Sequence, residues 1–419
     1  MRKAFLAVLA AVILLSGCTG KSTEGPKIHE MEQEDEITLS FVNSWGGADS
    51  NAGALQQIFD NFEAKYPNIK IQNEATFGDD FLPKLKTDFA TGNDPDVFGI
   101  WPGSDMEALI HAGKAADLTD IINSDPEWKS SFLNAWGYCT FDDKIYGLPV
   151  EIIYEALFIN TDIFKRYDVK APVTYEDFMV LVRLFASKGV VPIAYNYQAE
   201  GTYLYQNIVA QMGGLQDGGD VEIFKQGMEN MKELYDRRAF PEDAYLISNT
   251  QRNELFLDGK AAMIVQGSWF TRNIYEAGMV DKVDMVPFPV FDKEHPDKYS
   301  LIYGLGCGTF FISQKAFDDP QKREAAILLL KELTSKEASA ILTNESGFIS
   351  NIDLSGTKNT YPSLYTKGME LIANAEHLVP PMDSLIDRNN WENILVPGFA
   401  DLYRYGNGQI DIIWGSMDE

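Results

Sequence analysis

Tryptophan and carboxylate side chains follow three predicted strands in the first quarter of the chain. Trp45 comes after the first strand, Asp79 and Asp80 after the second, and Trp101, with Asp105 close behind, after the third. An indole offers a flat apolar face and a carboxylate accepts hydrogen bonds, so together they suit a ligand with both C–H faces and hydroxyl groups. Each tryptophan could instead cap its sheet as a structural plug. Two indoles in equivalent loops favour a binding face.

Alternating strands and helices must position these loops. Residues 37–41 alternate with period two, 69–75 and 95–100 have the composition of two further strands, and apolar side chains three and four residues apart predict helices between them. Such alternation predicts a parallel sheet with right-handed crossovers. Ligands bind such sheets at the carboxyl ends of the strands, where the three loops lie.

A second tryptophan-bearing turn occurs in residues 255–270. Asp258-Gly259 is a turn pair that should end a helix, and Ala261–Val265 is an apolar run suited to a buried strand. Gln266-Gly267-Ser268 should stop this strand and aim Trp269 into a crevice. The alternative is a core residue after a tight turn, which is the commoner role of an isolated tryptophan.

This stretch, Leu-Phe-x-x-Gly-Lys-Ala-Ala-Met leading to Gly-Ser-Trp, resembles the signature of family 1 extracellular solute-binding proteins, of which maltose-binding proteins are the best known. These are the substrate-capturing subunits of ATP-binding-cassette (ABC) importers, mostly for sugars. The resemblance implies an α/β, two-lobed periplasmic-binding-protein-like fold. Each lobe would be a mostly parallel sheet flanked by helices, with the ligand cleft between the lobes. The chain would capture a mono- or oligosaccharide by hinge closure and deliver it to the permease subunits, without catalysis.

The resemblance also implies where the chain crosses between lobes. Residues 146–160 resemble the first crossing, residues 299–308 the second, and residues 345–348 the third. Lobe 1 is then 37–149 plus 305–347, and lobe 2 is 150–304 plus 348–419. Arg388-Asn389-Asn390-Trp391 matches by position an aromatic that closes over the sugar. The implied ligand site comprises Trp45, Asp80, Trp101, Asp105, Glu151, Tyr154, Trp269, Tyr303, Gly304, Arg388 and Trp391.

A tyrosine-rich stretch precedes the Trp269 turn. Four tyrosines crowd a segment broken by Gly201, namely Tyr195, Tyr197, Tyr203 and Tyr205. Such a loop can wall a sugar pocket, or its tyrosines can simply cover a domain surface.

The first 18 residues predict a targeting segment. Arg2 and Lys3 precede an apolar run, Ala4 to Leu15, that is too short for a stable membrane span. Leu-Ser-Gly-Cys then resembles a bacterial lipobox, which implies that Cys18 becomes the lipid-bearing N-terminus and anchors the protein to the outer side of the cell membrane. The alternative is an ordinary secretory signal with an incidental cysteine. Residues 19–36 are expected to be a flexible tether.

Length, composition and short motifs limit the number of domains and the kinds of partner and cofactor. The 419 residues suggest two or three domains, and a formal charge of -27 argues against nucleic acid as a partner. We find no zinc or phosphate-loop motif and expect no metal or cofactor; the glycine run 304–308 lacks the third glycine of a dinucleotide fingerprint. Cys139 and Cys307 are expected to be free buried thiols, and the protein a monomer.

Two other classes of function are compatible with acids beside aromatics. A cell-surface carbohydrate-active hydrolase would use Glu151 and Glu155 as its carboxylate pair. On a strand these lie about 13 Å apart, whereas glycosidases need roughly 5.5 to 9.5 Å; on a helix they would lie closer. A passive adhesin or scaffold lipoprotein would have little use for a hinge and a tryptophan-lined rim.

Overall fold

The computed structural model of the chain describes residues 36–46, 49, 51–76, 80–133, 135–357 and 363–417. Contacts within the chain place Ile37 and everything after it in one compact unit, which holds all the elements described below. The predicted targeting segment, Cys18 and residues 19–35 of the predicted tether lie outside the described residues, as does Asp79.

The first sheet has five strands in the order β2-β1-β3-β12-β6. Its strands are β1 (Ile37–Asn43), β2 (Ile69–Ala75), β3 (Val97–Gly99), β6 (Gly147–Pro149) and β12 (Thr309–Ile312). β1 pairs in parallel with β2 and β3, as the strand–helix alternation predicts. β12, which comes from a distant part of the chain, is antiparallel to both β3 and β6.

Helices cover this sheet and bury the apolar stripes expected from the sequence. In α1, Leu55, Ile58, Phe59 and Phe62 are all buried against the strand core. The helices around this sheet are α1 (Ala52–Lys65), α2 (Phe81–Thr91), α3 (Ser104–His111), α4 (Thr119–Ser124), α5 (Pro126–Ser130), η2 (Trp136–Cys139), α12 (Gln314–Asp318), α13 (Pro320–Leu333) and α14 (Lys336–Ser346). A small ladder joins β4 (Thr140–Phe141) to β5 (Lys144–Ile145).

The second sheet is built around one long strand, β7 (Glu151–Asn160), all ten residues of which are buried. β7 is antiparallel to four partners: β9 (Ala261–Gly267), β10 (Val283–Val286), β11 (Ser300–Leu305) and β13 (Ile349–Ser350). Parallel pairs add β8 (Val191–Ile193) to β9 and β14 (His377–Val379) to β11. Both sheets are therefore mixed, and the expectation of mostly parallel sheets is wrong; the α/β class is confirmed.

The helices of the second sheet begin at the caps that the sequence predicts. Thr174 and Asp177 form a complete capping box, and the Asp220 side chain accepts the first N–H groups of α9. The helices are α6 (Thr161–Arg166), α7 (Tyr175–Ser187), η3 (Ala199–Thr202), α8 (Tyr203–Gln211), α9 (Val221–Asp236), α10 (Asn249–Leu257), α11 (Phe270–Glu276), η4 (Val280–Lys282), α15 (Ser363–Asn374), η5 (Met382–Ser384), α16 (Arg388–Asn390), the π-helix η6 (Trp391–Leu395), α17 (Val396–Tyr405) and α18 (Gln409–Gly415).

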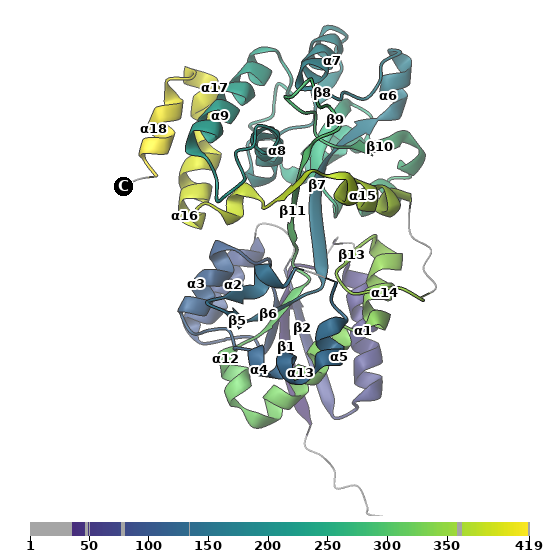
Figure 1. Ribbon diagram of the computed structural model, residues 1–419, viewed down its shortest axis with the longest axis vertical. Coiled ribbons are helices and arrows are strands. Elements are labelled where there is room, and N and C mark those ends of the chain that lie inside the picture. The colour runs from purple at the N-terminus through teal and green to yellow at the C-terminus, as the bar shows by residue number, and fades with distance from the viewer. Residues whose placement is uncertain are drawn as a thin grey trace, which may run out of the picture. The chain divides into compact units, whose positions relative to one another are not determined.

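The chain passes between the two sheets at three neighbouring places. A single residue, Val150, separates β6 from β7, and residues 306–308 separate β11 from β12. The N–H groups of Val150 and Glu151 both donate to the Gly308 carbonyl at 3.0 Å, and the Asn351 N–H donates to the Val150 carbonyl at 2.7 Å. In Figure 1 the elements of the two sheets form two groups joined at these passages.

Candidate functional site

An aromatic pair, Trp269 and Tyr203, lies at the carboxyl end of β9. Trp269 follows this strand after Ser268 and is only partly buried. Its ring folds back over Gly267, where an added Cβ would lie 2.1 Å from a ring atom, so only glycine fits beneath it. The Tyr203 ring meets the indole edge-on, with 5.7 Å between centroids. The partial exposure of Trp269 favours a ligand-facing side chain over a core plug.

A small cavity adjoins this pair and draws residues from both sheets. Its volume is about 10 Å³, and it is lined by Asn51, Glu151, Ser268, Trp269, Ser346, Gly347, Phe348 and Ile349. Asn51 caps the first helix of the first sheet, whereas Trp269 belongs to the second. A cavity this small holds roughly one water molecule, while small-molecule sites usually exceed about 300 Å³. A sugar-sized ligand could therefore bind here only if the two sheets moved apart.

Glu151 occupies this cavity as a buried carboxyl group at the passage between sheets. Its Oε2 accepts the Gly308 N–H at 2.8 Å. A Cβ at Gly306 would lie 2.2 Å from the same oxygen, so the glycine makes room for the carboxyl group. Burial raises the pKa of Glu151 to about 8 and the charge of Asp49 raises it further, whereas the Gly308 N–H lowers it. At neutral pH Glu151 is therefore mostly protonated and can donate a hydrogen bond.

Glu155 is a second buried carboxyl group, and it lies on the same face of β7 as Glu151 because side chains alternate along a strand. Its Oε2 accepts from the Asn207 amide at 2.7 Å. Burial and then the charge of Asp383 raise its pKa well above the ordinary value. Asp383, in η5, has its own pKa raised by burial. Burial raises the pKa of the Tyr203 hydroxyl well above its ordinary value, and the charges of Glu200, Glu155 and Asp383 raise it further. Glu155 lies directly opposite Gly267 in the β7–β9 pair, at the strand end that Trp269 follows.

The sequence pointed to Glu155 only as half of a catalytic pair, and Asp383 was missed. The signal for Glu155 was available, because it lies four residues from Glu151 on one strand. Asp383 follows Pro381 in a segment with no periodicity, and only the fold brings it to the site.

Three of the predicted residues come together where α16 of the second sheet meets α3 of the first. Arg388 Nε lies 3.2 Å from Asp105 Oδ2, and the guanidinium carbon is 5.8 Å from the centre of the Trp101 ring. Lys86 Nζ lies 3.0 Å from Asp105 Oδ1. Neither Asp105 Oδ1 nor Arg388 Nε is aligned for a hydrogen bond, so these contacts are ion pairs. Asp80 is exposed next to Phe81, whose ring lies 5.9 Å from that of Trp101.

Two predicted tryptophans are core residues instead. Trp45 is 3% exposed and meets the rings of Phe310 and Phe348 edge-on at 5.9 and 5.8 Å. Trp391 is 1% exposed in the core of the second sheet. Their expected place at the ligand site is corrected: both are packing residues, as the plug alternative for Trp45 foresaw.

Two predicted tyrosines point away from the carboxyl groups. Tyr154 is fully buried, and its hydroxyl donates to Met285 Sδ at 3.5 Å. Tyr303 lies directly opposite Tyr154 in the β11–β7 pair, so both side chains share one face of the sheet. Because that face is opposite to the one bearing Glu151, their expected role in the site is corrected. Gly304 does face this site, and Pro381 packs where its side chain would be.

Cysteines, metal-binding groups and membrane-spanning helices can also be assessed in the described residues. Cys139 and Cys307 are free and buried, as predicted. Within these residues no three side chains of metal-binding type gather, and no helix is both long and apolar enough to cross a membrane.

Comparisons with known proteins bear on the family and the fold. The family described as bacterial extracellular solute-binding protein matches residues 57–362. An uncharacterized ABC transporter extracellular-binding protein of Pyrococcus horikoshii is 26% identical over 308 residues, 68% of this chain and 70% of that protein. The maltodextrin-binding protein MdxE of Bacillus subtilis is 25% identical over 352 residues, 77% and 75% of the two chains. A solved chitin oligosaccharide binding protein superposes with a TM-score of 0.80 at 19% identity, covering 92% of this chain and 98% of its own.

Proposed function

Because the chain belongs to the bacterial extracellular solute-binding proteins, we propose that it captures a mono- or oligosaccharide outside the cell membrane and delivers it to the permease of an ABC importer. The observation that carries the sugar assignment is the Trp269–Tyr203 pair at the end of β9, where Glu155 lies opposite Gly267 and is itself influenced by the charge of Asp383. The indole offers a stacking face for sugar C–H groups, and the acids offer partners for hydroxyls. Relatives named for maltodextrin and chitin oligosaccharide support a carbohydrate.

Capture would proceed by hinge closure of two lobes, 37–149 plus 305–347 and 150–304 plus 348–419. The three passages between sheets, close together at Val150, Gly308 and Asn351, suit a hinge. The cavity of about 10 Å³ supports the same motion, because a sugar enters only an open form.

A binding role rather than hydrolysis is supported by the placement of the two glutamates. Glu151 and Glu155 lie four residues apart on β7, which separates their Cα atoms by about 13 Å along the strand, beyond the roughly 5.5 to 9.5 Å of glycosidase pairs. We further propose that the protein is a monomer anchored to the membrane through lipid on Cys18. The lipobox and the tether composition of residues 19–36 support this anchor.

A thermal-shift screen tests the function. Maltotriose, raffinose, chitotriose and xylotriose are each added to the purified protein, and at least one should raise the melting temperature. At a hundred times the dissociation constant the stabilisation is about 2.7 kcal/mol. Chromatography of the same samples should recover each sugar intact. Release of shorter sugars would show a hydrolase, and an unmoved melting temperature with every sugar would count against the carbohydrate assignment.

A further inference from the structure

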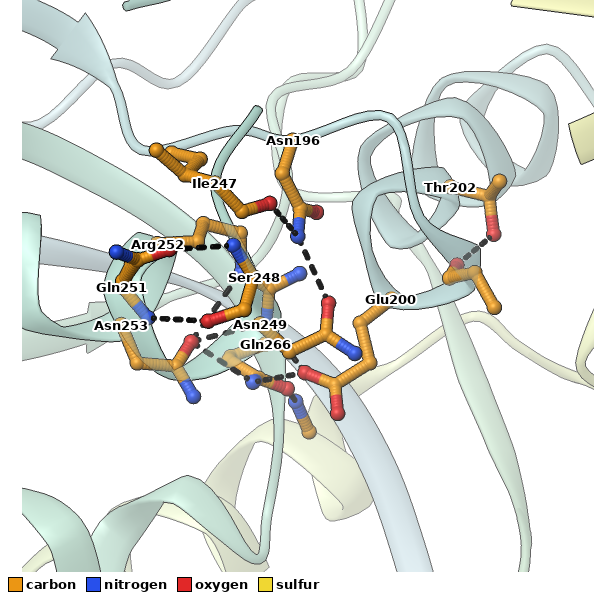
Figure 2. A network of polar contacts seen from close by, with 12 residues as sticks. Asn196, Glu200, Thr202, Ile247, Ser248, Asn249, Gln251, Arg252, Asn253 and Gln266 are labelled. Carbon is orange, nitrogen blue, oxygen red and sulfur yellow. Dashed lines mark hydrogen bonds and ion pairs between the residues drawn. The ribbon is translucent and has the colours of Figure 1, made fainter. Parts of the chain in front are cut away.

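A network of polar contacts joins side chains from residues 196–202 and 247–253 to Gln266 of β9 (Figure 2). Arg252, in α10, is 1% exposed, and its Nη2 donates to Glu200 Oε2 at 2.5 Å. Nε and Nη2 also donate to Asn253 Oδ1, at 3.2 and 2.9 Å. A buried guanidinium is tolerated only when it is paired and hydrogen-bonded, so these partners hold Arg252 in one geometry.

Gln266 joins this network to the strand that carries Trp269. Its Nε2 donates to Glu200 Oε2 at 3.1 Å and to Asn253 Oδ1 at 3.3 Å, the same two acceptors that Arg252 uses. Its Oε1 accepts the Gly267 N–H at 2.9 Å, directly beneath the Trp269 ring. The conformation of the turn after β9 therefore depends on the network.

Glu200 joins the same network to Tyr203. It lies in η3, which runs directly into Tyr203 at the start of α8. Trp269 thus follows β9, which holds Gln266, and Tyr203 follows η3, which holds Glu200. Both Arg252 and Gln266 donate to Glu200 Oε2.

The beginning of α10 is itself fixed. Ser248 and Gln251 form a complete capping box there. The Asn196 amide donates to Asn249 Oδ1 at 2.9 Å, and Gly201 packs directly on the Asn196 carbonyl. Arg252 is therefore held by a rigid helix start, and η3 is held against the same asparagine.

We propose that Arg252 is a positioning residue, which with Glu200 and Gln266 sets the angle between Trp269 and Tyr203 without touching the ligand. The inference rests on the proposed function, since the aromatic pair is taken as the stacking platform for a sugar. Arg252 acts on affinity only through Trp269. An arginine that merely stabilised the fold would change stability and leave the Trp269 contribution to binding intact.

A double-mutant cycle separates the two roles. Isothermal titration with maltotriose, raffinose, chitotriose and xylotriose compares the wild type, Arg252→Met, Trp269→Ala and the double variant. We expect Arg252→Met to weaken binding about tenfold in the wild type but less than twofold in the Trp269→Ala background, because coupled residues are not additive. Equal losses in both backgrounds would overturn the proposal. Arg237→Met, an arginine paired with Glu233 on the outer helix α9, is the matched control and should bind like the wild type.

Two further measurements keep the proposal testable if Arg252→Met folds poorly or none of the sugars binds. Gln266→Met keeps the side-chain volume, removes the link to Glu200, and should give the same non-additive pattern. Acrylamide quenching of tryptophan emission needs no ligand; subtracting the Trp269→Phe spectrum isolates Trp269 among the seven tryptophans. Arg252→Met and Gln266→Met should at least double the quenching of Trp269. Unchanged quenching would refute the inference, whereas a wild type that binds no sugar would refute only the proposed function.

Discussion

The guanidinium of Arg388 lies against Asp105, with 3.2 Å between Nε and Oδ2, and so joins α16 to α3. The Asp105 side chain is 4% exposed and that of Arg388 17%, so water screens the pair only weakly. Gly103 approaches Ser384 nearby, with 3.3 Å between its would-be Cβ and Ser384 Cβ. Elements of the first sheet and the C-terminal helices therefore touch through the chain's own side chains.

Replacing Arg388 should weaken sugar binding. Arg388→Gln removes an ion pair that, if the lobes close by a hinge, forms only in the closed protein, at a cost of about 1–2 kcal/mol. Affinity should fall roughly 5- to 30-fold, measured by titration calorimetry. Small-angle scattering at a sugar concentration that closes the wild type should show the variant to be more expanded. Arg404→Gln, on the exposed face of α17, is the control. If Arg388→Gln binds sugar and scatters like this control, the Arg388–Asp105 ion pair does not stabilise the closed protein.

Trp269 and Trp391 should respond in opposite ways to truncation. Trp269→Ala removes a partly exposed stacking face worth about 1.5–3 kcal/mol, so affinity should drop roughly tenfold to a hundredfold while the unliganded protein melts nearly as before. Trp391→Ala empties a site in a packed core and should cost about 3–5 kcal/mol of unfolding free energy. Melting curves and titrations of both variants provide the test. Early melting of Trp269→Ala with normal sugar binding would mean that this residue serves packing.

Glu151 should make the protein less stable as the pH rises. Burial places its folded-state pKa at about 8, whereas the unfolded chain titrates near the ordinary 4.5. Between these values the folded state holds a proton that the unfolded state has released, so the free energy of unfolding falls with increasing pH. Glu151→Gln removes this slope, because the amide does not titrate. Urea unfolding should show that the free energy of unfolding of the variant increases relative to that of the wild type from about pH 5 to about pH 8. If the two free energies change in parallel with pH, the pKa of Glu151 is not raised.

Cys18 should carry the membrane anchor. In the native bacterium, mass spectrometry should find a diacylglycerol-modified Cys18 at the mature N-terminus, because Leu-Ser-Gly precedes it. Cys18→Ser should release the protein from membranes on cell fractionation. A mature chain that starts at another residue and appears in the medium would contradict this prediction.

Local patterns were sufficient to predict most elements near the site. The 261–265 run became β9, which continues through Gln266 and Gly267 before the turn, and Trp269 stayed partly exposed, because turn residues and hydrophobic spacing act over a few positions. The direction of a side chain requires more than its neighbours in sequence. Trp45 follows a strand just as Trp269 does, yet Phe310, from a distant strand, meets its ring and seals it in the core.

Tyr154, wrongly expected at the site, shows what the periodicity of a strand could have predicted. Glu151 and Tyr154 are three positions apart, so on one continuous strand they must face opposite sides. Glu155, at even spacing from Glu151, was the better choice. Arg252 had no such signal: its helix has polar neighbours on both sides, and only the fold buries it.

β7 also governs the order in which the protein can fold. Its partners come from residues 261–267, 283–286, 300–305 and 349–350, all far downstream. Contacts between segments so distant in sequence form slowly, because long loops must close first. The central strand, with its apolar run Ala156–Ile159, therefore stays without its full set of neighbours until most of the polypeptide is available. Until then the apolar run of β7 lacks the strands that bury it in the folded protein.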